Sequence, residues 1–243
     1  MQVLNYEFSD KFDKFYEDSQ KKLRRVISFH PIKEHPNEYV KEARGAHLID
    51  EVNVKVFINT DMLDSTEAEV TAAEDIVYAL LRTVDKFPFA LANTTLEEQK
   101  LFEAEAIAGV LTVPIHHLVV ISRLKADGFW IEALQEKDKQ ELLEMLGRGI
   151  SEEPPPDSLP HYNLVMRYIE TSFYEGIDFT ETRELYESKV PYVSSVAEQG
   201  VEIVQRYGYN TSKKCLNTLI DLRDLLELRG RIWIKNTETD LVF

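Results

Sequence analysis

The chain has 243 residues, a net charge of −15 and a single cysteine. The length is enough to bury a substantial core in one large domain or in a domain with an appendage, and 44% hydrophobic with 29% charged residues is ordinary for a soluble globular protein. No apolar run approaches the roughly 18 residues that span a bilayer. A single cysteine excludes an internal disulfide and a zinc cluster of thiolates. The acidic net charge opposes unassisted binding to nucleic acid. We expect a cytoplasmic protein whose acidic surface suits a protein partner with a basic surface, and no membrane association.

The first expected elements are a helix and two strands. Apolar residues at helical spacing after Ser9, a good N-cap, predict an amphipathic helix over about residues 9–29. A proline-containing loop follows, and a short helix is expected to end at Gly45. Alternating apolar residues over 46–58, interrupted by a polar turn, then predict two strands.

Helices are expected over most of the remaining chain. The pairs Thr66/Glu69 and Thr95/Glu98 have the spacing of capping boxes, and Pro114 suits the first turn of a further helix. The expected helices cover about residues 66–85, 95–113, 114–128, 129–146, 161–174, 193–207 and 211–229, and a terminal strand covers 231–235.

These elements predict an α+β fold, predominantly α-helical with a small antiparallel β-sheet. Residues 151–160 contain four prolines and can form neither a helix nor a central strand. We therefore expect a domain over 1–150, a linker over 151–160 and a C-terminal helical domain over 161–243.

Two of the expected helices carry carboxylates within otherwise core-like sequence. The first has Glu74, Asp75 and Tyr78 at positions i, i+1 and i+4, and the second presents Glu103. A strand that ends in I-N precedes them, and the second helix continues as E-A-E-A-I-A-G-V-L-T-V-P. Over residues 52–114 this order of elements resembles the zinc metallopeptidase domain of the ImmA/IrrE type.

The resemblance implies the positions of a metal site but not its ligands. In that family two histidines at i and i+4 hold zinc, a glutamate beside the first activates the metal-bound water, and a glutamate from the second helix completes the site. By this resemblance Glu74 and Tyr78 stand where the histidines would be, Asp75 stands at the general base and Glu103 at the third ligand. Oxygen ligands alone suit zinc poorly. The resemblance therefore implies a metallopeptidase-like scaffold without a catalytic metal or cofactor, that is, a pseudoenzyme.

The C-terminal segment looks like a winged helix-turn-helix. Residues 193–235 are expected to form a helix, a turn, a second helix and a strand, and seven basic residues against three acidic ones lie between positions 206 and 235. The candidate DNA-binding residues are Lys213, Lys214 and Asn217 near the start of the second helix, where such helices contact base edges, together with Arg231 in the strand. The same helix could instead pack its leucines into a core or a dimer interface.

These patterns predict a non-catalytic regulatory or protein-binding protein, of the kind found near prophage and mobile-element switches. A DNA-binding transcription regulator that uses the C-terminal helices is the first alternative. A hydrolase that holds a hard divalent metal through Glu74, Asp75 and Glu103 is the second. The oligomeric state is left open.

Overall fold

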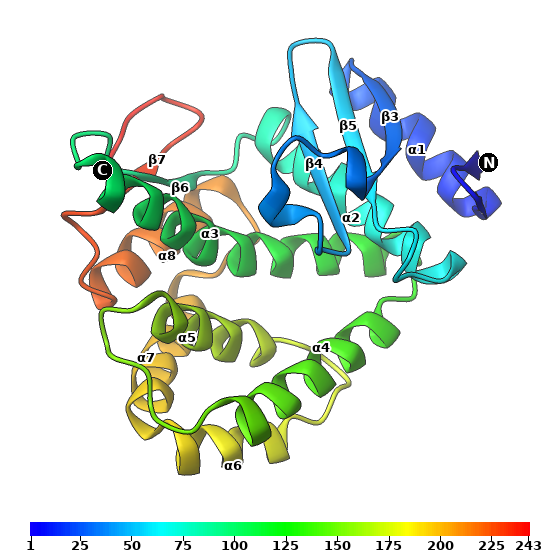
Figure 1. Cartoon of the computed structure of the whole chain (residues 1–243). Coiled ribbons are helices and arrows are strands. Elements are labelled where there is room, and N and C mark those ends of the chain that lie inside the picture. The colour runs from blue at the N-terminus through cyan, green and yellow to red at the C-terminus, as the bar shows by residue number, and fades with distance from the viewer. The chain divides into compact units, whose positions relative to one another are not determined.

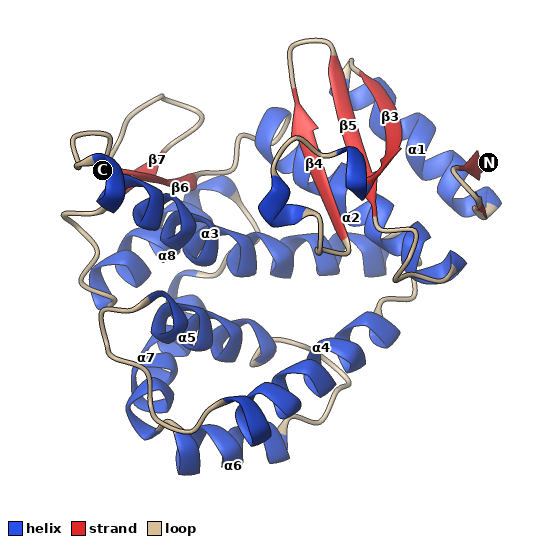
Figure 2. Ribbon diagram, viewed as in Figure 1, coloured by secondary structure: helices blue, strands red, loops and turns tan.

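The helices and strands are shown in Figures 1 and 2, drawn from a computed structural model that describes residues 1–243 except for the side chain of Tyr39. Helices make up 57% of the chain and strands 12%, which confirms the predominantly helical α+β class. The chain divides into two compact units. The first contains residues 1–85 and 120–131, and the second contains residues 86–119 and 132–243.

The first unit combines two packed helices with a three-stranded sheet. Its elements are β1 (Gln2–Val3), β2 (Tyr6–Glu7), α1 (Asp10–Leu23), β3 (Val26–Pro31), β4 (Gly45–Ile49), β5 (Asn53–Ile58) and α2 (Ser65–Thr83), with 3-10 turns at Ile32–Glu34 and Glu38–Val40. The sheet has the order β3-β5-β4, in which β4 and β5 are antiparallel and β3 and β5 are parallel. Helix α2 packs against β4, β5 and α1.

Burial explains the central strand. Val54, Val56 and Ile58 are fully buried on one face of β5, and Phe57 is buried on the other, as the sequence pattern indicated. Both faces of the strand are therefore covered, which suits β-branched and aromatic side chains.

Three local predictions in this unit were wrong. The first helix ends at Leu23 because Arg24 adopts a left-handed conformation (φ 53°), and residues 26–31 then pair with β5 instead of continuing the helix. Gly45 begins strand β4 and does not end a helix, since the segment between β3 and β4 forms 3-10 turns and no α-helix. The capping box of α2 is Asp64/Glu67, two residues before the predicted pair.

The second unit is a set of helices with a two-stranded sheet. Its elements are β6 (Phe89–Ala92), α3 (Glu98–Ala126, of which residues 98–119 belong here), α4 (Glu132–Glu144) with a π turn at Met145–Gly149, α5 (Leu159–Thr171), α6 (Thr180–Lys189), α7 (Pro191–Tyr207), α8 (Ser212–Leu225) and β7 (Ile232–Lys235). Helix α7 packs against α5, α6 and α8. Strand β7, which the sequence predicted, pairs antiparallel with β6. The sequence interpretation missed β6 and therefore this pairing.

Helix α3 is one continuous element, where two helices were predicted. Pro114 lies inside it and is buried. The helix begins at Glu98, because Thr95 donates both its N–H and its hydroxyl to the Asn93 side chain in the preceding turn. Residues 106–122 contain no Asp, Glu, Lys or Arg, a longer uncharged stretch than the sequence interpretation recognised. By length and composition α3 could span a membrane, but 61% of its most apolar window is buried, as in a core helix of a soluble protein.

The proline-rich residues 151–160 lie within the second unit, and two of them cap helices. The Ser158 side chain accepts the N–H of His161 at the start of α5, and the Glu153 carboxylate accepts the N–H groups of Tyr192 and Val193 at the start of α7. The predicted three-part domain division stays a prediction, and the compact units follow different boundaries.

Candidate functional site

The predicted site positions on α2 lie beside a histidine that the sequence interpretation did not select. His47 Nδ1 on β4 is 2.8 Å from Asp75 Oδ1, and Asp75 is only 7% exposed. The Tyr78 ring stacks on the imidazole, with centroids 5.9 Å apart and an interplanar angle of 17°. Asp75 and Tyr78 reach the same imidazole because residues three apart on a helix share a face, and this face of α2 packs against β4.

The carboxylate of Asp75 is held very close to the backbone of β4. A Cβ atom at Gly45 would lie 2.5 Å from Thr71 Cγ2 and 2.7 Å from Asp75 Oδ2, so only glycine fits there without a shift. Asp75 Oδ2 and Thr71 Oγ1 are buried and form no hydrogen bond with the described residues. One carboxylate oxygen of Asp75 thus interacts with His47, and the other is packed closely against Gly45.

This arrangement orients an imidazole but does not assemble a metal site. A carboxylate that accepts Nδ1–H leaves the lone pair on Nε2, which is the arrangement of a general base or a single metal ligand. Among the described residues no group of three or more His, Cys, Asp or Glu side chains could hold a metal ion. Glu74, next to Asp75, is half-buried and has interactions of its own.

The fourth predicted position, Glu103, belongs to the second unit. Its carboxylate is 3.0 Å from Arg231 Nη2. Two residues predicted for different sites therefore form an ion pair with each other. Burial raises the pKa of Tyr162, and the nearby charge of Arg231 opposes that rise.

The predicted DNA-binding residues at the start of α8 are largely accessible. Lys213 and Lys214 are exposed in its first turn, which Thr211 caps by accepting the Lys214 N–H, and Asn217 is half-buried. The opposite side of α8 is buried through Leu219, Leu222 and other residues (Cys215, Thr218, Arg223). The helix therefore packs one face into the unit and leaves its basic first turn at the surface.

A buried ionic cluster in the second unit was also missed. Glu170 on α5 is 5% exposed, and its Oε1 accepts hydrogen bonds from His117 Nδ1 of α3 and, at 3.0 Å, from the Tyr174 hydroxyl. Burial by itself would raise the pKa of Glu170, but the charges of His117 and Arg167 and the two hydrogen bonds hold it below its usual value. Burial and the nearby Glu170 charge raise the pKa of Tyr174. These contacts join α3 to α5 and have a structural role.

Comparison of the chain with protein-family models, with curated protein sequences and with solved structures finds no match. The resemblances to the ImmA/IrrE domain and to a winged helix-turn-helix therefore stay predictions.

Proposed function

We propose that this protein is a non-catalytic regulatory protein of the cytoplasm, on a metallopeptidase-like scaffold, and that it binds a protein partner with a basic surface. The observation that carries the proposal is the partly buried contact between Asp75 and His47 at 2.8 Å. A general base must reach a metal-bound water, whereas this carboxylate is used to hold β4 against α2.

Two other predicted site positions support the same conclusion, because each is used in a contact of its own. Tyr78 stacks on His47, and Glu103 pairs with Arg231. The net charge of −15 gives the surface a field that attracts a basic partner and repels polyanions.

Restoring the missing histidines tests the scaffold. Wild type and Glu74→His/Tyr78→His are equilibrated with Zn²⁺, desalted and assayed for bound metal, with circular dichroism as the control for folding. We expect no stoichiometric zinc in the wild type and about one equivalent in the double variant, because histidines at i and i+4 grip zinc.

Two outcomes contradict this proposal. Stoichiometric zinc, Mn²⁺ or Mg²⁺ in the wild type would favour the carboxylate-based hydrolase that uses Glu74, Asp75 and Glu103. A folded double variant that binds no zinc would remove the metallopeptidase-like scaffold.

Partner binding is tested separately, by salt. Cellular proteins bound to the immobilised protein at low ionic strength and released at about 0.5 M salt are identified by mass spectrometry, since exposed charge pairs are screened at that concentration. The proposal expects basic proteins in this fraction, and a fraction of neutral or acidic proteins contradicts it.

DNA binding is the second candidate, favoured by the exposure of Lys213 and Lys214 at the start of α8. A mobility-shift titration compares the wild type with Lys213→Glu/Lys214→Glu and with a control of equal charge change, Lys100→Glu/Lys189→Glu. A wild type that shifts no duplex DNA rejects this candidate.

A further inference from the structure

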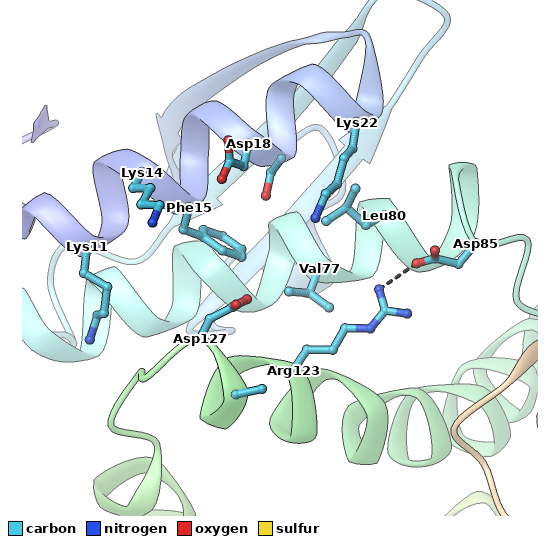
Figure 3. A pocket seen from close by; sticks show the side chains of 12 residues that line it. Lys11, Lys14, Phe15, Asp18, Lys22, Val77, Leu80, Asp85, Arg123 and Asp127 are labelled. Carbon is cyan, nitrogen blue, oxygen red and sulfur yellow. Dashed lines mark hydrogen bonds and ion pairs between the residues drawn. The ribbon is translucent and has the colours of Figure 1, made fainter.

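A groove of about 590 Å³ lies within the first unit, apart from the predicted site residues. Figure 3 shows it between α1 and the C-terminal end of α3, with α2 behind. Phe15 of α1 and Val77 and Leu80 of α2 form its apolar floor. The volume is in the range of pockets that bury a ligand.

The α1 side of the groove carries cations that the protein does not neutralise. Lys14 and Lys22 are exposed, line the groove and form no ion pair with any described residue. Asp18 lies between them on α1 and also lines the groove, but it pairs with Lys21 at 3.4 Å. Lys14 and Lys22 are eight residues apart, which corresponds to about 12 Å along a helix. Lys11, which also lines the groove from α1, already has partners within the protein. Its Nζ donates to the Gly128 carbonyl at 2.9 Å and lies 4.5 Å from the Phe129 ring centroid.

The α3 side has a different charge balance. Arg123 Nη1 is 2.6 Å from Asp85 Oδ2, so this cation is neutralised, and Asp127 is exposed at the end of the helix. The groove therefore has one side on which lysines outnumber the single carboxylate of Asp18, an apolar floor, and one neutral to acidic side.

We infer that this groove binds an amphipathic helical segment of a protein partner. Its apolar residues would cover Phe15, Val77 and Leu80, and two of its acidic residues would face Lys14 and Lys22. The spacing of the two lysines along α1 matches that of carboxylates at i and i+7 of a helix, which are about 10 Å apart on one face.

The apolar floor and the overall charge favour such a segment over other anions. Helix-in-groove recognition needs apolar anchors, which the phosphates of nucleic acid lack. A long polyanion or an anionic membrane would also experience the −15 charge of the whole chain, while a short segment experiences mainly charges within a Debye length of about 8–10 Å. This groove and its occupant are independent of the pseudoenzyme proposal.

The probe is a pair of 18-residue helical peptides that share one leucine face. One carries glutamate along both edges of that face, and its twin carries lysine at the same positions. An environment-sensitive dye on Asp18→Cys, which lines the groove, reports binding, and Cys215 does not compete for the dye because it is fully buried. We expect the glutamate peptide to bind about tenfold more tightly, because exposed ion pairs contribute roughly 0.2–1 kcal/mol each and like-charge pairs oppose binding similarly.

Charge reversal decides whether the groove is responsible. Lys14→Glu/Lys22→Glu should bind the lysine peptide more tightly, while the control Lys21→Glu/Lys55→Glu, with the same charge change outside the groove lining, should keep the wild-type preference. Equal affinity for the two peptides, or an equal effect of the control, overturns the inference. A dye response without peptide that rises with protein concentration would indicate that a second copy of the chain occupies the groove, and it would overturn the inference. A dye response to phosphatidylglycerol vesicles but to neither peptide would also overturn it.

Discussion

Glu170→Gln is expected to lower the free energy of unfolding of the second unit by about 2–4 kcal/mol at pH 7. Removing one partner of a buried ion pair costs about 3–5 kcal/mol. The amide carbonyl of glutamine can still accept the Tyr174 hydroxyl, and that hydrogen bond retains about 1 kcal/mol. The loss comes from leaving the half-buried His117 and Arg167 without the charge of the carboxylate that they contact.

The pH dependence of this loss has a defined sign. The native pKa of Glu170 lies below its usual value, and an unfolded glutamate titrates near 4.3. The stability that its carboxylate contributes is therefore fully present above about pH 4.3 and is lost as the pH falls through the lower native value. The wild type should lose its advantage over Glu170→Gln in that acidic window.

Urea unfolding followed by Trp233 fluorescence measures this effect in a Trp130→Phe background, because Trp130 belongs to the first unit and Trp233 to the second. Glu187→Gln on the exposed face of α6 is the matched control and should change stability by less than about 0.5 kcal/mol. A loss below about 1 kcal/mol for Glu170→Gln, or a constant difference from pH 7 to pH 3, would refute the ionised buried cluster.

Two further predictions follow from local packing and burial. Gly45→Ala should lower the free energy of unfolding by about 1–3 kcal/mol in thermal denaturation, because its Cβ would overlap Thr71 and Asp75. The control Gly109→Ala in α3, with no atom within 4 Å of the new Cβ, should raise the free energy of unfolding by about 0.5–1 kcal/mol. Equal effects of the two substitutions would contradict the close approach of β4 to α2. Cys215 should not react with a thiol reagent in the native protein, because burial excludes the reagent and raises the pKa of the thiol, and fast reaction before unfolding would show that α8 is not packed as described.

The elements that the sequence predicted are those specified by local signals. The pair β4–β5 has alternating residues around a short turn, and α1 and α5 have the side-chain caps Ser9 and Ser158. Two of the missed strands depend on partners distant in sequence. Val26–Pro31 forms a strand because β5 is available beside it, and Phe89–Ala92 forms one because β7 pairs with it.

The candidate site could be predicted only in part for the same reason. Asp75 and Tyr78 are neighbours on one helix face, so their proximity follows from helical spacing. His47 is 28 residues from Asp75 in the chain and has no local motif, so only the packing of β4 on α2 brings the two side chains together. Likewise, nothing in the sequence near Glu103 indicates that its partner is Arg231.

The pairing of β6 with β7 has a consequence for how this chain is made. The Asn93 side chain donates to the Gly230 carbonyl beside these strands, and the two residues are 137 positions apart. During synthesis, residues 89–92 leave the ribosome long before their partner strand, and their backbone groups stay unpaired until residues 232–235 emerge. Such late, non-local closure slows folding and leaves a strand edge exposed to association in the meantime. Deleting residues 232–235 is therefore expected to impair solubility, because the edge of β6 at residues 89–92 would stay unpaired.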